Sequence, residues 1–213
     1  MNKFIFSLAM LSGFFISALS MAQSTDIILS KPDLNSGKPL MSALSERSSA
    51  REFNEMDLSH EHLSGLLWAA CGINRPESGK RTAPSAMNWQ DVQVYVFLKT
   101  GIFFYNEKDH KLVLIVEGDH RAAAGSQDFV AKAPVNLIYV SDYSQMTKAS
   151  EEDMEFYSGI NTGFISQNVY LYCASESLNT VVRAWVDRDA LHKLIGLKPK
   201  QHVVAGQTVG YRP

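Results

Sequence analysis

The chain has 213 residues and a formal net charge of −2 at pH 7, with 46% hydrophobic and 20% charged residues. This length is enough for one domain with a sizeable core. The near-neutral charge argues against nucleic acid or an anionic membrane surface as the main partner. We find no internal repeat and no low-complexity segment, so the composition is that of an ordinary globular protein.

The first 22 residues predict a secretory signal peptide. Lys3 gives a short basic start, an apolar run extends from Phe4 to Met21, and Ala22 supplies the small residue at the cleavage site. A retained N-terminal anchor is the alternative, because the basic flank is thin and the run is nearly long enough to span a bilayer. Cleavage would give an exported, periplasmic protein with no further membrane-crossing stretch, a polar arm over residues 23–38 and one domain over 39–213.

Two helices and a long loop are predicted at the start of the domain. Apolar residues at helical spacing indicate a helix over residues 39–45, and Ser59 is placed to cap a second helix that ends near Gly72. The stretch GINRPESGKRTAPSAMN, residues 72–88, is rich in turn formers and predicts a loop.

Strands and helices alternate along the rest of the chain. VQVYVFLK alternates well enough to be a strand, and GIFFYNEKDHKLVLIV predicts two strands joined by a polar turn. We expect further strands over residues 134–141, 180–186 and 202–211, and helices over residues 119–131, 150–178 and 190–195. This mixture indicates an α+β domain with a central sheet covered by helices.

The predicted helix over residues 150–178 has two notable features. Ser150 and Asp153 form a capping box at its start. Gly159 and Gly163 lie inside it, and since each glycine costs about 1 kcal/mol relative to alanine, we expect another element to approach the helix closely there. An apolar stripe is marked by Phe156, Ile160, Phe164 and Val169.

Motifs for metal binding or hydrolysis are absent from the sequence. It contains no CxxC, no HExxH and no GxSxG motif, and the acidic run EED at residues 151–153 is explained by helix capping. His60 and His62 point to different sides of a helix, and His110 and His120 neighbour acidic residues on turns, so we expect solvated side chains at all four positions.

The two cysteines, Cys71 and Cys173, lie in the apolar helical contexts LLWAAC and YLYCAS. Free cysteine behaves in such surroundings as a small buried hydrophobic residue. An exported chain could also pair the two thiols in a disulfide, so both states stay open at this point.

The strongest candidate for ligand binding is the stretch RSSAREF. Arg47 and Arg51 are four residues apart with Ser48 and Ser49 between them, which suits a phosphate clamp, although a solvated surface turn is the alternative. The stretch PSAMN adds a rigid backbone and an amide, Asn88, that both donates and accepts hydrogen bonds.

The ordered series RSSAREF, LLWAACGINR, RTAPSAMNWQ, KAPVNLIYV, GFISQNVYLYCASESLNTV and TVGY resembles the nitroreductase-like FMN-dependent oxidoreductases over about residues 40–211. Within that family it is most similar to the branch of azoline-oxidising peptide dehydrogenases. The resemblance implies an obligate-type α+β homodimer. It also implies a central, mostly antiparallel sheet covered by helices, and FMN in a cleft made by both subunits.

The resemblance also implies a set of cofactor-binding residues. The family's arginine–x–serine–x–basic pattern, which holds phosphate and ribitol, matches Arg47, Ser49 and Arg51, with Ser48 at a position that is often basic. The family's PS-x-x-N segment, which would form one wall of the flavin pocket, matches Pro84, Ser85 and Asn88.

Near the C-terminus, the family runs its backbone past the flavin ring at the positions of Val182, Arg183, Ala184 and Trp185. Glycine is frequent in the family where Ala184 or Trp185 stands here, so Trp185 could narrow or stack over the pocket. Arg212 is the only match for the family's basic phosphate contact in this region.

The long helix would form the dimer core, with Gln167 and Asn168 as buried hydrogen-bond partners rather than catalysts. The implied mechanism has two steps. A donor such as NAD(P)H reduces FMN at N5, and an exported small molecule or peptide then takes the electrons; no acid or base side chain is required.

Export raises two alternatives, because NAD(P)H should be scarce outside the cytoplasm. The chain could be a non-catalytic FMN-binding or scavenging protein on the same fold. It could also be a structural dimer that has lost flavin, if Trp185 fills the cleft.

Overall fold

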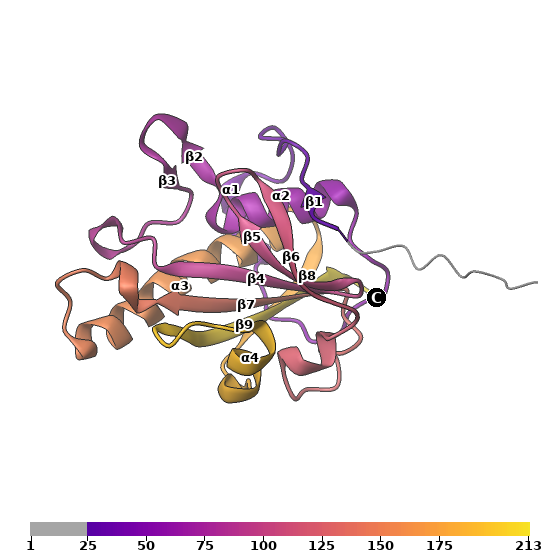
Figure 1. Cartoon of the computed structure of the whole chain (residues 1–213). Coiled ribbons are helices and arrows are strands. Elements are labelled where there is room, and N and C mark those ends of the chain that lie inside the picture. Colours follow the sequence, from indigo (N-terminus) through magenta and orange to yellow (C-terminus); the bar gives the residue numbers. More distant parts are fainter. Residues whose placement is uncertain (1–24) are drawn as a thin grey trace, which may run out of the picture.

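The computed structural model describes residues 25–213, which form a central sheet with helices on both faces (Figure 1). The predicted signal peptide, residues 1–22, falls outside this range. Among the described residues, no helix combines the length and apolar character needed to cross a membrane.

The sheet has seven strands in the order β1-β6-β5-β4-β7-β9-β8, and every neighbouring pair is antiparallel. The strands are β1 (Ile27–Ile28), β4 (Val92–Leu98), β5 (Gly101–Asn106), β6 (Lys111–Glu117), β7 (Val135–Asp142), β8 (Leu178–Arg183) and β9 (Gln201–Tyr211). The predicted α+β fold with an antiparallel central sheet is therefore confirmed.

The helices are α1 (Leu40–Glu46), α2 (His60–Cys71), α3 (Glu151–Ser175) and α4 (Arg188–Ile195). Both predicted N-terminal caps are confirmed. The Ser59 hydroxyl accepts the His62 N–H at 3.1 Å. The Ser150 hydroxyl accepts the Asp153 N–H at 3.1 Å and donates to the Asp153 carboxylate at 2.8 Å, which completes the capping box.

Side-chain alternation along β4 builds two cores, one on each face of the sheet. Val94 and Val96 pack on the face covered by α2 and α3. Tyr95 and Phe97 pack on the opposite face, together with α4 and the segment before β7. Every residue of β7 is buried, as its continuous apolar run predicts.

The predicted helix over residues 119–131 is wrong. Only a short 3-10 turn, Arg121–Ala124, forms there. Backbone carbonyls of this segment and of the residues after it accept hydrogen bonds from arginine side chains instead of from helical N–H groups. Arg121 donates to the carbonyls of Lys132 and Ala133, and Arg183 donates to the carbonyl of Ala124. These bonds hold the segment in an irregular path against one face of the sheet, over β4 and β7.

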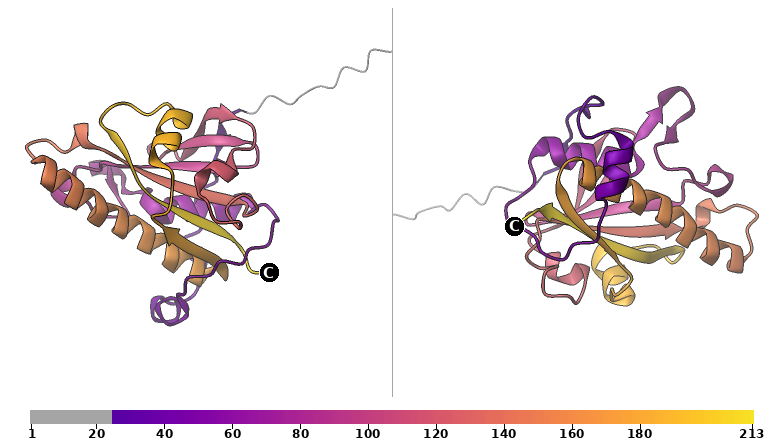
Figure 2. Two further views of the ribbon diagram at one scale, coloured as in Figure 1. Left: turned by 90° about the horizontal axis from the view of Figure 1, so that it is seen from below. Right: turned by 180° about the vertical axis from the view of Figure 1, so that it is seen from behind.

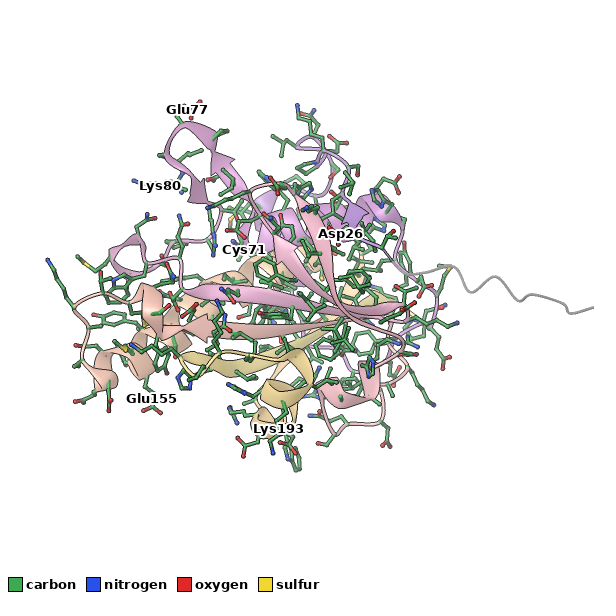
Figure 3. The ribbon with its side chains drawn as sticks, in the orientation of Figure 1. Asp26, Cys71, Glu77, Lys80, Glu155 and Lys193 are labelled. Carbon is green, nitrogen blue, oxygen red and sulfur yellow. The ribbon has the colours of Figure 1, made fainter. Side chains whose placement is uncertain are left out.

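Three further expectations are corrected at the margins of the fold. The arm contributes β1 to the sheet edge, and the loop over residues 72–88 contains a hairpin of β2 (Ile73–Arg75) and β3 (Lys80–Arg81). Figure 3 shows this hairpin projecting from the body, with Glu77 and Lys80 near its tip. The strand expected over residues 180–186 ends at Arg183, because Asp187 caps α4 shortly afterwards.

His110 is not solvated as expected. Its Nε2 atom lies 3.0 Å from the Ser30 carbonyl oxygen and 2.8 Å from the Ser64 hydroxyl, and its Nδ1 atom lies 2.8 Å from the Tyr105 hydroxyl. Burial lowers the pKa of His110. The imidazole therefore fastens the N-terminal arm to the sheet as a neutral group.

Cys71 and Cys173 are both free and buried, so the disulfide alternative is not supported. Desolvation raises the pKa of Cys71 to about 12 and also raises the pKa of Cys173. Both thiols are therefore packing groups, as their apolar contexts indicate.

Candidate functional site

The turn after α1 presents the predicted phosphate clamp. The Arg47 guanidinium lies 5.3 Å from the centre of the Tyr170 ring, and the Ser49 hydroxyl oxygen is 2.8 Å from the Tyr170 hydroxyl oxygen. Ser48 and Arg51 are exposed. Within the described part of the chain neither arginine forms a salt bridge, so both guanidinium groups are available to an anion.

This turn is attached to β8, where the residues expected near a flavin ring begin. The Ala50 N–H donates to the Thr180 carbonyl at 3.0 Å, and the Val182 N–H donates to the Tyr170 hydroxyl at 2.9 Å. The structure therefore brings the clamp and the end of β8 together, although they are more than 130 residues apart in the chain.

The side chain of Arg183 points into the protein. Its guanidinium donates to the Ala124 carbonyl at 2.7 Å, to the Asn136 side chain at 3.0 Å and to the Thr208 hydroxyl at 3.0 Å. Desolvation lowers the pKa of Arg183 to about 10, which leaves it charged at neutral pH. Arg183 therefore supports the strand end from within, and only its backbone is placed to meet a ligand.

Ala184 and Trp185 follow on the surface, and the Trp185 side chain is 75% exposed. Within one chain, therefore, Trp185 fills no cavity. Arg212 is also exposed, and its neighbour Tyr211 accepts the Asn54 N–H at 2.9 Å. The C-terminus therefore lies beside the segment that follows Arg51.

The PSAMN loop has a constrained backbone. Met87, Asn88 and Gln90 have positive φ angles of 50°, 55° and 51°. Side chains without a β-branch tolerate this region at a cost, and such clusters persist where the surroundings hold them. Here the Ser85 hydroxyl accepts the Gln90 N–H at 2.9 Å, while the Pro84 and Asn88 side chains stay exposed.

A buried polar network lies beneath this loop. The Asn161 side chain accepts the Ala86 N–H at 3.0 Å and donates to the Asp91 carboxylate at 2.7 Å. The Ser141 hydroxyl donates to the other Asp91 oxygen at 2.6 Å. Burial raises the pKa of Asp91, although these two hydrogen bonds act in the opposite direction. Sequence reasoning missed this network, because a single asparagine inside a helix carries no motif.

The two halves of the predicted site lie on opposite sides of α3. Asn161, under the PSAMN loop, and Tyr170, under the clamp, are nine residues apart, which is about 13 Å along the helix and half a turn around it. The helix therefore separates the two halves within one chain.

Between the two halves, α3 has an uncovered apolar face. Phe156, Ile160 and Phe164 are 61%, 36% and 42% exposed, whereas Val169 is buried, so the predicted stripe divides between surface and core. A β-carbon added at Gly159 or Gly163 would meet no atom within 4 Å. Figure 2 shows α3 along one side of the molecule, with α1 standing out beside it.

Gln167 and Asn168 do not act as hydrogen-bond partners within one chain. Gln167 is exposed, and neither side chain forms a hydrogen bond with another described residue. Residues 25–213 also contain no group of three metal-ligating side chains. The chemistry available at the candidate site is therefore that of guanidinium groups, hydroxyls, amides and backbone.

Comparison with known proteins gives a consistent result. The model of the nitroreductase family matches residues 44–211. A candidate nitroreductase of Methanocaldococcus jannaschii, MJ1384, is 32% identical over 169 residues, which cover 74% of this chain and 84% of that protein.

Solved structures agree with this match. The crystal structure of a candidate nitroreductase from Ralstonia eutropha has a TM-score of 0.85 and 38% identity, covering 90% of this chain and 91% of the other. The NADPH:FMN oxidoreductase of Vibrio harveyi, complexed with NAD+, has a TM-score of 0.61 and 19% identity, covering 81% and 68%, and shows the fold alone. Together with the family match, these similarities show that the chain belongs to the nitroreductase family of oxidoreductases.

Proposed function

We propose that the protein is an FMN-dependent oxidoreductase that works as a homodimer and transfers electrons to an exported small molecule or peptide. The observation that carries the proposal is the phosphate clamp beside the end of β8, where Arg47 and Arg51 flank Ser49 in the sequence and form no salt bridge with any residue of the described range 25–213. When bound, FMN supplies reversible two-electron chemistry, accepting hydride from a donor such as NAD(P)H and passing it to the acceptor.

The residues present suit this cofactor. Two guanidinium groups and a serine hydroxyl bind a phosphate dianion, and Arg212 lies beside the segment after Arg51 and adds a third positive charge to this region. Asn88 offers an amide that matches the donor and acceptor atoms of a flavin's polar edge. The candidate binding residues named here include no carboxylate and no histidine, so the role of these side chains is to bind and orient the cofactor.

The uncovered face of α3 supports the dimer. The apolar stripe and the two glycines suit close packing against a second helix, and a monomer rarely leaves such a face in water. The stripe runs between the clamp and the PSAMN loop. A two-fold partner seated on it would bring its own PSAMN loop toward the clamp, which one chain alone does not do.

A second candidate is a non-catalytic FMN-binding protein on the same fold. The exposed Trp185 favours it, because a large aromatic side chain at the end of β8 would restrict access to a bound flavin ring. Export to the periplasm, where NAD(P)H is scarce, would also favour the non-catalytic alternative. Export itself stays a prediction.

An anaerobic titration tests the proposal. The purified protein should carry or take up FMN and turn yellow. NADH or NADPH should then bleach the flavin absorbance, and a quinone or nitroaromatic acceptor should restore it. A protein that stays yellow with every donor would favour the non-catalytic alternative, and a protein that takes up no FMN would contradict both.

A further inference from the structure

The hydroxyl of Tyr170 forms hydrogen bonds with both the clamp and β8. It comes from α3, it is 8% exposed with the rest of its side chain, and it has two partners that lie far apart in the sequence. One is the Ser49 hydroxyl at 2.8 Å, and the other is the Val182 N–H at 2.9 Å. The stretch GFISQNVYLYCASESLNTV contains this tyrosine, but neither the motifs nor the resemblance described above gives it a role.

The second partner sets the direction of the first hydrogen bond. A backbone N–H only donates, so the Tyr170 oxygen accepts from Val182 and keeps its own proton. That proton is then placed to donate to the Ser49 oxygen. Ser49 in turn keeps its own proton, which is free to donate outward to an anion.

The aromatic ring of Tyr170 acts on the same turn. The Arg47 guanidinium stands 5.3 Å from the ring centre, within the range of a cation–π contact. Arg47 is half-buried, and this contact limits the directions in which its side chain can point. One side chain thus orients both a hydroxyl donor and a cation of the clamp.

We propose that Tyr170 is a positioning residue for the phosphate end of the cofactor. Anchored by the Val182 N–H, it directs the Ser49 proton and the Arg47 guanidinium toward a bound phosphate. This inference rests on the proposed FMN function and deepens it, because it assigns to Tyr170 the discrimination between FMN and riboflavin, which lacks the phosphate.

The test measures FMN and riboflavin binding by titration of the flavin-free protein, followed by flavin fluorescence. Tyr170→Phe removes only the hydroxyl and keeps the ring. We expect the dissociation constant for FMN to rise about three- to tenfold, the range expected for one lost hydrogen bond, while that for riboflavin changes less than about twofold. Thermal unfolding of the same samples shows that the variant is folded.

The matched control is Tyr172→Phe on the same helix. The Tyr172 hydroxyl donates to the His62 carbonyl at 3.3 Å, so this variant also loses one helix-to-neighbour hydrogen bond, but away from the clamp. It should leave the FMN dissociation constant unchanged. A double-mutant cycle adds Ser49→Ala, in whose background Tyr170→Phe should weaken FMN binding by a smaller factor, because the two hydroxyls act together.

The outcomes are distinguishable. If the wild-type protein binds no FMN, the proposed function itself fails. If the wild-type protein binds FMN and Tyr170→Phe binds it equally well, the inference about Tyr170 fails alone. Equal losses for FMN and riboflavin would also overturn it, because they would mean that Tyr170 supports the fold rather than the phosphate site.

Discussion

The buried network under the PSAMN loop gives a quantitative prediction for Asn161→Ala. The substitution removes a hydrogen bond to a buried carboxylate and leaves the Ala86 N–H without its partner. Hydrogen bonds to charged groups are worth about 1.5 to 3 kcal/mol, and an unpaired half-buried amide adds about 1 kcal/mol. The better helix propensity of alanine returns about 0.6 kcal/mol. We therefore expect a net loss of about 2 to 3.5 kcal/mol of unfolding free energy.

Urea denaturation monitored by circular dichroism measures this loss, and Asn168→Ala provides the control. Asn168 lies on the same helix and is half-buried, but its side chain makes no hydrogen bond with the described residues. That variant should be neutral or slightly stabilised. A difference below about 0.5 kcal/mol between the two variants would refute the reasoning, because it would mean that the Asp91–Asn161 bond adds nothing to stability.

The penalty of Asn161→Ala should also depend on pH. Asp91 has a raised pKa in the folded protein, so its folded form holds a proton more tightly than the unfolded chain does. Its contribution to stability is full below the ordinary carboxyl pKa of about 3.9 and is lost as pH rises through the higher folded pKa. Removing the Asn161 donor raises that pKa further. The gap between variant and wild type should therefore widen from acid toward neutral pH.

Other predictions concern the helix face, the buried imidazole and the thiols. A β-carbon at Gly163 meets no atom within 4 Å in one chain, so Gly163→Leu should dissociate the proposed dimer while the far-ultraviolet circular dichroism spectrum stays unchanged; an intact dimer by light scattering would contradict the interface. The lowered pKa of His110 means that wild-type stability should fall as pH drops below about 6.5, and His110→Asn should flatten that dependence in urea titrations. Cys71 and Cys173 should react with an aromatic disulfide reagent at pH 8 only after denaturation, and rapid labelling of the native protein would contradict their burial.

Local signals account for the parts of the fold that the sequence predicted correctly. Ser59 and Ser150 cap their helices through contacts within three residues, and β4 shows its alternation directly in the sequence. The prediction of a helix over residues 119–131 was wrong because Arg121 and Arg183 hold the backbone there through hydrogen bonds that depend on the tertiary fold. The segment consists largely of small residues without apolar periodicity, so its sequence could not indicate whether it forms a helix or an irregular path.

The candidate site shows the same division. The clamp and the PSAMN loop are continuous in the sequence, so the resemblance to the nitroreductase family was enough to identify them. The parts that hold them are single residues brought together by the fold, such as Tyr170 between Ser49 and Val182, and Asn161 between Ala86 and Asp91. Their partners lie from 12 to 121 residues away in the sequence, so no spacing rule could reveal them.

The claim that the flavin site is shared by two chains has a direct test in a mixing experiment. One variant loses the clamp by Arg47→Ala with Arg51→Ala, and the other loses the loop amide by Asn88→Asp; each alone should bind FMN weakly. After subunit exchange at equal concentrations, a shared site predicts tight FMN binding in about a quarter of the sites. Half of the dimers are then mixed, and each mixed dimer has one intact site and one site that lacks both the clamp and the loop amide. If mixing restores no tight binding although mixed dimers form, the two halves do not combine across the interface, and the account is wrong.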